Sequence, residues 1–303
     1  MNESKRISVI GVASDVGGLY RGASQAPAVL RTRGLPDSLS QLGYLAGDSG
    51  DIIAVEVDSE GGQEIVNHLQ VVQVARNLYD RMLEVLANDT FPLIIGGDHS
   101  ISTGSVAAFS DHCRSRGQRP GLLWVDTHAD INTPQTSPSA CAFGMPVAAL
   151  LGIFPDTLSR ISSNPPALLA EQIVYVGLRD VDQGERRLIR DMRIQAYTMK
   201  EIDAVGLAAV VEKAVAHLRQ HCDCVILSFD LDVCDPQIVP GTGTPKRGGL
   251  TFRESHLLME LLWDSNILGA AEIVELNPVL DKDFETADLT ISLIESLLGK
   301  SIL

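Results

Sequence analysis

Trp124-Val125-Asp126-Thr127-His128-Ala129-Asp130 is an apolar run that ends in three side chains able to bind a metal ion. These side chains, Asp126, His128 and Asp130, are spaced two residues apart. In an extended chain, residues i, i+2 and i+4 project to the same side. We therefore expect the three to converge just beyond the carboxyl end of a buried strand.

Two other apolar runs end in side chains of the same kind. The run Cys224 to Phe229 leads into Asp230 and Asp232. The run Pro92 to Ile95 leads, through two glycines and an aspartate, into His99. Open α/β sheets bind ligands at the carboxyl ends of their strands. The predicted metal ligands are therefore His99, Asp126, His128, Asp130, Asp230 and Asp232.

Extended and helical patterns alternate along the chain, which is typical of βαβ units and a parallel sheet. We expect one domain, residues 1–303, of the α/β class, with a doubly wound, mostly parallel sheet and helices on both faces. The polar loop 131–143, which contains two prolines, is expected to lie outside the core. Strands are expected near 7–13, 93–97, 121–125, 172–177, 224–229 and 270–276, and helices near 24–33, 61–88, 100–116, 183–192, 206–220, 251–263 and 285–298.

Composition excludes several classes of partner. The net charge of -15 argues against nucleic acid and against an anionic membrane surface, because both would repel the chain. The first apolar run, 7–13, is too short for a signal peptide or a membrane span. The five cysteines are odd in number and follow no framework spacing, which favours reduced thiols in a cytoplasmic protein.

The predicted ligand set favours a pair of divalent cations. Its four aspartates carry a charge of about minus four when ionised, and mostly oxygen ligands with two imidazoles suit manganese better than zinc. Two such ions lower the pKa of a bridging water enough to supply hydroxide. Taken singly, an Asp-x-Asp at a strand end is more often a helix cap or turn, and His99 could be a core histidine.

Three motifs together resemble the metal-binding motifs of the arginase (ureohydrolase) family, in the same order and separation over nearly the whole chain. They are Gly96-Gly97-Asp98-His99-Ser100, Asp126-Thr127-His128-Ala129-Asp130 and Ser228-Phe229-Asp230-Leu231-Asp232. The resemblance is closer to arginases than to agmatinases. It implies a three-layer fold, two Mn²⁺ per chain, a small guanidino substrate, hydrolysis of L-arginine to L-ornithine and urea, and a homo-oligomer, commonly a trimer or hexamer.

The resemblance also assigns residues to the substrate. The segment after Asp130 resembles the loop that holds the substrate's α-carboxylate, and Gly177 to Glu185 resembles the segment that binds its α-amino group. Glu275 matches the glutamate that receives the guanidinium, although a strand-terminal surface glutamate is the alternative. Asp130 and Glu275 would stabilise the reacting centre. The implied substrate residues are Asn132, Ser137, Ser139, Asp182, Glu185 and Glu275.

The chain departs from the family pattern beside this predicted site. Phe143 occupies the position where arginases carry a histidine that protonates the leaving amine. Ala140 and Cys141 replace the usual glycine and asparagine, and Lys246 and Arg247 stand where small or apolar residues are common. A phenylalanine can neither donate nor relay a proton, so ordinary arginase efficiency is not expected.

Three hypotheses remain open. The chain is a slow or specialised arginase-like hydrolase, with Asp130 or water protonating the leaving group. Alternatively, it hydrolyses a modified substrate such as N-hydroxy-L-arginine, or acts as another ureohydrolase of the agmatinase, guanidinobutyrase or formiminoglutamase type. The third is a metal-binding homologue without activity, although four clustered carboxylates favour a working site.

Overall fold

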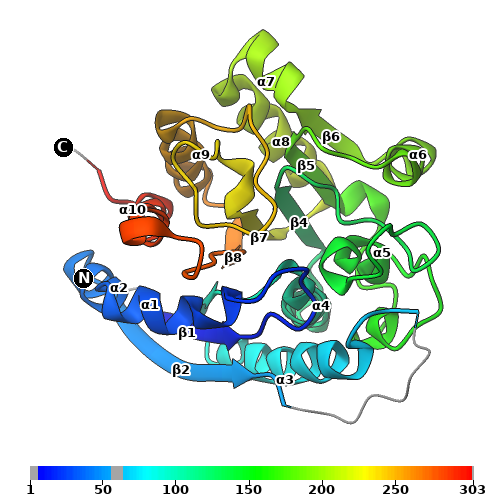
Figure 1. The fold of residues 1–303 in the computed structure, drawn as a ribbon, viewed down its shortest axis with the longest axis horizontal. Coiled ribbons are helices and arrows are strands. Elements are labelled where there is room, and N and C mark those ends of the chain that lie inside the picture. The colour runs from blue at the N-terminus through cyan, green and yellow to red at the C-terminus, as the bar shows by residue number, and fades with distance from the viewer. Residues whose placement is uncertain (1–5, 56–63, 302–303) are drawn as a thin grey trace.

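The computed structural model describes residues 6–55 and 64–301. These residues contain a sheet of eight strands. The sheet lies at the centre of the molecule (Figure 1). All neighbouring strands in the described residues run parallel, in the order β2-β1-β3-β8-β7-β4-β5-β6. The prediction of a parallel α/β sheet is confirmed. The strands are β1 (Arg6–Ala13), β2 (Leu45–Ile53), β3 (Phe91–Ile95), β4 (Pro120–Val125), β5 (Ile173–Leu178), β6 (Gln195–Thr198), β7 (Cys224–Asp230) and β8 (Leu268–Val274).

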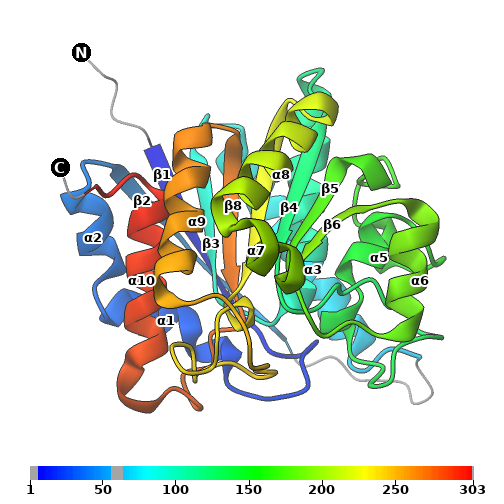
Figure 2. The same ribbon diagram turned by 90° about the horizontal axis from the view of Figure 1, so that it is seen from above.

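Helices cover both faces of the sheet, as Figure 2 shows from above. One hydrophobic core lies under α1, α2, α7, α8, α9 and α10, and the other lies under α3, α4 and α5. The helices are α1 (Ala26–Thr32), α2 (Leu35–Gln41), α3 (His68–Leu86), α4 (Ser102–Ser115), α5 (Pro146–Leu150), α6 (Gln183–Met192), α7 (Met199–Val205), α8 (Leu207–His221), α9 (Phe252–Ser265) and α10 (Glu285–Leu297).

The central strands are apolar on both sides because each face meets a helix layer. In β4, Leu123 and Val125 enter one core, while Leu122 and Trp124 enter the other. All six residues of this strand are buried. A continuous apolar run is what a parallel strand covered on both faces requires.

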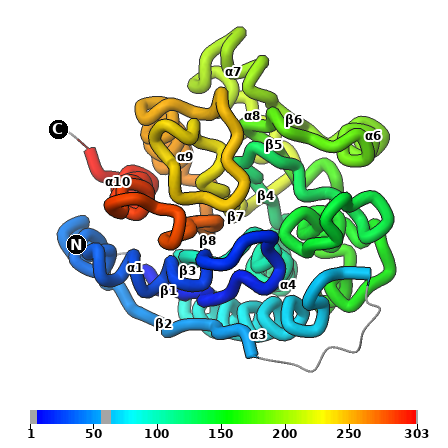
Figure 3. The backbone as a smooth tube through the Cα atoms, in the orientation of Figure 1, coloured from blue at the N-terminus to red at the C-terminus, as the bar shows by residue number. Residues whose placement is uncertain are grey.

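The loops that follow the strands gather at the carboxyl edge of the sheet. In Figure 3 the segment after β1, in blue, lies beside the segments after β7 and β8. Two hydrogen bonds join them: Asn277 Nδ2 donates to the carbonyl of Arg21 at 3.1 Å, and Asn277 N donates to that of Gly241 at 2.8 Å. The site therefore lies where chain segments far apart in sequence meet.

Several sequence expectations need correction. The helix expected from residue 61 begins at His68, because Asn67 takes a left-handed conformation with φ of 51°; residues 61–63 lie outside the described residues. Strands β2 and β6 were not predicted. The first is almost wholly exposed at one edge of the sheet, and the second has four half-buried residues at the other. Edge strands of this kind lack the apolar run on which the prediction relied.

The loop 131–143 was expected to lie outside the core, but part of it is buried. Residues near both of its ends are buried: Ile131 is 0% exposed, and Ala142 is 2% exposed. Backbone hydrogen bonds from Asn132 N to the carbonyl of Gly144 and from Val147 N to that of Asp130 close the loop at its base. Only the middle of the loop reaches the surface.

No helix among the described residues is long and apolar enough to cross a membrane.

Candidate metal centre and substrate cavity

A tight turn after β3 places His99 at the centre of the site. Gly96 and Gly97 have φ values of 81° and 87°, and a Cβ on Gly96 would lie 2.6 Å from Pro27 Cδ. Asp98 then accepts hydrogen bonds from Gly17 N and Ser100 N. These contacts start a short 3-10 turn in which His99 is fully buried. The glycine pair is thus required by the backbone at this position.

The hydrogen bonds of His99 determine which ring nitrogen is available as a ligand. Nε2 lies 2.8 Å from Ser228 Oγ on β7, two strands away in the sheet, which leaves Nδ1 directed at the carboxylates. The ring stacks on Trp124, with centroids 3.9 Å apart and an interplanar angle of 7°. The orientation of the imidazole is therefore fixed before any ion binds.

Asp126, directly after β4, directs its two oxygens toward two different histidines. Its Oδ2 lies 3.1 Å from His99 Nδ1, and its Oδ1 lies 3.5 Å from His128 Nδ1. Trp124 Nε1 donates to the first oxygen at 3.0 Å, and the backbone N of His128 donates to the second at 2.7 Å. Asp126 can therefore bridge two centres.

The convergence of the three ligands after β4 has a different cause from the one expected. The strand ends at Val125, so the alternation of an extended chain does not continue through Asp130. Asp130 instead has a φ of 48°, and this left-handed turn brings its Oδ2 to 3.2 Å from His99 Nδ1. The residues are those predicted, but a turn rather than a strand brings them together.

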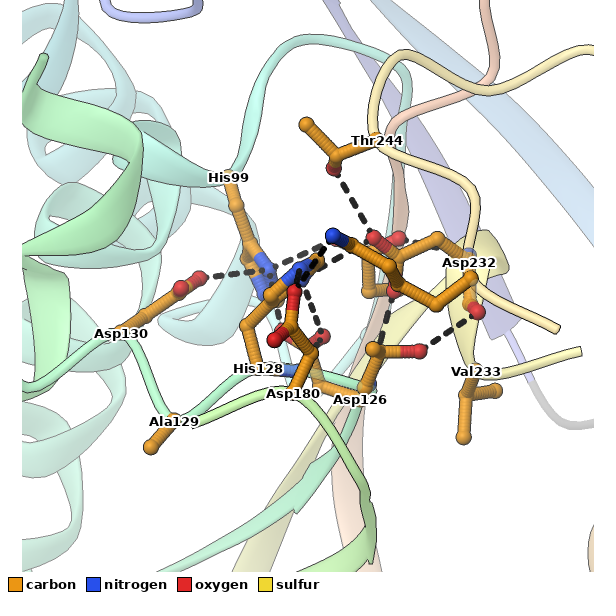
Figure 4. A network of polar contacts seen from close by, with 12 residues as sticks. His99, Asp126, His128, Ala129, Asp130, Asp180, Asp232, Val233 and Thr244 are labelled. Carbon is orange, nitrogen blue, oxygen red and sulfur yellow. Dashed lines mark hydrogen bonds and ion pairs between the residues drawn. The ribbon is translucent and has the colours of Figure 1, made fainter. Parts of the chain in front are cut away.

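The structure groups five of the six predicted ligands into two sets that share Asp126 (Figure 4). His99, Asp126 and Asp230 form one set, and Asp126, His128 and Asp232 form the other, with the ligand atoms of each set within 4.8 Å of one another. His99 Nδ1 is 3.1 Å from Asp230 Oδ2, and His128 Nδ1 is 3.1 Å from Asp232 Oδ2. Asp130 adjoins the first set through His99.

Burial raises the free energy of the ionised carboxylates in this cluster. Burial and the charge of Asp126 raise the pKa of Asp130 to about 6, and burial and the charge of Asp232 raise the pKa of Asp230 well above its usual value. Burial alone would lower the pKa of His99, but its bonds to three aspartates raise it well above 6.5. Carboxylates crowded in this way favour a shared positive charge. This donor set fits two divalent ions.

Glu275 lies at the end of β8 and belongs to the interior. It is 8% exposed, which excludes the alternative of a surface glutamate. Its Oε1 accepts a hydrogen bond from His99 N at 2.8 Å, and burial together with the charge of Asp98 raises its pKa to about 8. Its φ of 65° is uncommon for a residue other than glycine. The carboxylate is held next to the metal ligands.

A cavity of about 220 Å³ opens above the cluster. Asn132 Nδ2 donates to Asp182 Oδ2 at 3.0 Å across it, and Glu185 accepts from Asp182 N and Ile131 N. Burial raises the pKa of Glu185 to about 8. The cavity is lined by His128, Asp130, Asn132, Ser137, Pro138, Ser139, Phe143, Gly144, Asp180, Asp182, Glu185, Thr244 and Lys246.

Among the predicted substrate residues, all except Glu275 line this cavity, and Phe143 lines it as well. Sequence reasoning missed Asp180 and Thr244. Thr244 Oγ1 donates to Asp232 Oδ2 at 3.0 Å, and Asp180 Oδ2 lies 3.6 Å from His128 Nε2. Thr244 follows no apolar run. Asp180 comes two residues after the buried strand β5, but it is a single acid beside Arg179 and lacks the paired spacing that identified the ligands.

Two groups of carboxylates and imidazoles that share one aspartate, at the carboxyl edge of a parallel α/β sheet, are typical of enzymes with a pair of metal ions. Residues 5–299 match the Arginase family, and the chain belongs to this family. It is 40% identical to the arginase of Bacillus caldovelox over 302 residues, which are 99% of this chain and 100% of the relative.

Other comparisons agree. The identity to the arginase of Bacillus subtilis (strain 168) is 40% over 299 residues, which cover 99% of both chains. The native structure of the Bacillus caldovelox arginase superimposes with a TM-score of 0.93, covering 99% of this chain and 100% of that one. An arginase of Entamoeba histolytica in complex with L-ornithine gives a TM-score of 0.91 at 30% identity, covering 98% and 100%. The chain is thus an arginase-like hydrolase of the ureohydrolase class.

Proposed function

We propose that the chain is a binuclear manganese hydrolase that converts L-arginine to L-ornithine and urea at a reduced rate. The observation that carries this proposal is the bridging position of Asp126 between His99 and His128. Glu275, held against His99 N, adds a carboxylate where a guanidinium would meet the cluster. A planar cation with a fork of N–H donors suits such a carboxylate.

Two Mn²⁺ ions bound by His99, Asp126, His128, Asp130, Asp230 and Asp232 would supply hydroxide from water near neutral pH. The chain's own residues position the substrate. Glu275 accepts the N–H groups of the guanidinium, and Asp130 accepts the proton released as the carbon is attacked. Asn132, Ser137 and Ser139 donate to the α-carboxylate, while Asp182 and Glu185 hold the ammonium side.

The reduced rate follows from Phe143. This side chain lines the cavity, where the alkylamine must leave as a protonated group. A positioned proton donor contributes on the order of a hundredfold or more to such a step. With phenylalanine there, Asp130 or water has to protonate the amine.

A second candidate substrate is N-hydroxy-L-arginine. Phe143 gives the cavity an apolar side beside the hydroxyls of Ser137 and Ser139. A hydroxyguanidine is less basic than a guanidine, so its hydrolysis depends differently on a proton donor. Other ureohydrolase substrates, namely agmatine, guanidinobutyrate and formiminoglutamate, are alternatives, as is a homologue that binds metal without turnover.

The wider setting is proposed on likeness to the family. Residues 1–303 form a single domain, and the chain assembles as a homo-oligomer, a trimer or a hexamer. The protein works in the cytoplasm on a small molecule. The five free cysteines agree with a reducing compartment.

The test is a substrate panel with manganese-loaded protein. Urea or hydroxyurea and the released amine are measured for L-arginine, N-hydroxy-L-arginine, agmatine, guanidinobutyrate and formiminoglutamate. Turnover of L-arginine above that of the other compounds supports the proposal. Preference for N-hydroxy-L-arginine supports the second candidate, and no turnover with full metal content contradicts both.

A further inference from the structure

Lys246 brings positive charge into an otherwise acidic cavity. Among the described residues that line the cavity, it is the one lysine or arginine. The same lining contains Asp180, Asp182 and Glu185 in addition to the metal ligand Asp130. An ammonium in this position is available to a negatively charged group of the substrate.

The main chain of Lys246 is fixed beside a metal ligand. Arg179 Nη2 donates to the carbonyl of Lys246 at 2.8 Å and to that of Asp232 at 2.8 Å. The same guanidinium donates to the carbonyls of Val233 and Cys234. The backbone at Lys246 is therefore tied to the turn after β7, and the freedom of this residue lies in its side chain.

The side chain of Lys246 neutralises an acid that could otherwise attract an ammonium. Its Nζ lies 2.7 Å from Asp180 Oδ2, and each side chain is 48% exposed. An ion pair this exposed is weak, so Nζ can also contact, or move to, another carboxylate at little cost.

We propose that Lys246 is a specificity-determining residue that selects guanidino acids through their carboxylate. This inference rests on the proposed function and narrows its substrate class. The carboxylate that Asn132, Ser137 and Ser139 hold also receives the ammonium of Lys246, which lines the same cavity. Because Lys246 neutralises Asp180, this acid adds little attraction for the α-ammonium beyond that of Asp182 and Glu185.

Arg247 provides a matched control. It is the next residue and carries the same charge, but it does not line the cavity and makes no ion pair in the described part of the chain. Both side chains are exposed. A general effect of surface charge would appear in both Lys246→Met and Arg247→Met, whereas a local effect would appear in the first alone.

Three compounds of equal length separate the two charged groups of the substrate. L-arginine has both the carboxylate and the ammonium, 5-guanidinopentanoate has the carboxylate alone, and agmatine has the ammonium alone. We expect manganese-loaded protein to prefer the first two. Lys246→Met should lower kcat/KM about tenfold for these two, mainly through KM, and should leave agmatine unchanged or improved. Arg247→Met should change none of them.

Equal losses for all three compounds, or equal effects of the two variants, would overturn the inference. So would turnover of agmatine above that of the two acids.

A binding experiment separates this inference from the proposed function. If the protein turns over none of the compounds, calorimetry with manganese-loaded protein measures binding of L-ornithine, 5-aminopentanoate and 1,4-diaminobutane. The first two should bind, and Lys246→Met should weaken both about tenfold relative to wild type and Arg247→Met. That result retains the role of Lys246 while the hydrolase proposal fails. Binding that does not depend on Lys246 contradicts the inference.

Discussion

The metal cluster lies at the base of the site, and the loop residues Asp180 and Lys246 line the cavity above it. The two regions are built differently. His99, Asp126 and Asp232 are 0% exposed, and they directly follow or adjoin central strands. Asp180 and Lys246 are each 48% exposed at the side chain and lie on loops. Buried groups with several partners tolerate little change, whereas loop residues can change without loss of the fold. We therefore expect substitutions in the cluster to abolish the reaction and substitutions in the loops to change the choice of substrate.

The largest expected effect comes from the bridging aspartate. Asp126→Asn removes the charge that both sets share and replaces the ligand oxygen of one set with an amide nitrogen, so we expect kcat/KM to fall by more than about a thousandfold. Metal analysis should find at most about one ion per chain, against two in wild type. Asp111→Asn is the control, because Asp111 is also a buried carboxylate, bonded to Tyr79 and Ser162, but away from the cluster. Full metal content in Asp126→Asn would refute the shared site.

A substitution at Phe143, which lines the cavity, should raise turnover rather than lower it. Phe143→His restores a proton donor beside the leaving amine, and we expect L-arginine turnover to rise by up to about a hundredfold. Phe143→Leu, which is apolar, should give no such rise. Steady-state kcat at matched manganese content measures both. If the histidine variant gains nothing, the missing donor does not limit the rate.

A smaller effect is expected where the cavity holds the ammonium side. Asp182→Asn removes a negative charge and weakens the contact with Asn132 Nδ2. We expect KM for L-arginine to rise roughly tenfold with little change in kcat, because the group binds substrate and transition state alike. Metal content should stay at the wild-type value. A fall in kcat without a change in KM would place Asp182 in the chemical step instead.

Glu185→Gln should have the smallest effect on turnover, but it should change how stability depends on pH. Burial raises the pKa of Glu185 from 4.5 to about 8, so the folded chain binds a proton that the unfolded chain releases between these values. The free energy of unfolding should therefore fall as pH rises through that window, by up to about 1.4 kcal/mol per pH unit. Glu185→Gln should flatten this slope in Tm measured against pH. An identical slope in the variant would exclude Glu185 as its cause.

The sequence predicted the parts of the molecule that depend on local pattern. The apolar runs before His99, Asp126 and Asp230 are buried parallel strands, and the helix expected at 183–192 is α6 (Gln183–Met192). Buried parallel strands carry a strong signal because both their faces must be apolar. The three motifs could therefore be placed at one edge of the sheet without the structure.

Features set by tertiary contacts could not be predicted in this way. The contact of Asp130 with His99, the anchoring of Glu275 on His99 N and the pair of Lys246 with Asp180 each join segments distant in sequence. The exposed edge strand β2 has no apolar pattern to reveal it. Local propensity does not encode such contacts, which arise only when the sheet is assembled.

The stack of Trp124 on His99 has an optical consequence. The indole is fully buried, lies 3.9 Å from the imidazole and donates its N–H to Asp126. Its fluorescence should therefore respond to any ion that His99 and Asp126 bind, and a paramagnetic ion such as Mn²⁺ should quench it. The other tryptophan, Trp263, lies beside Gly299 and provides a second, remote emitter. Trp124 is thus an intrinsic fluorophore with which metal binding can be followed without added labels.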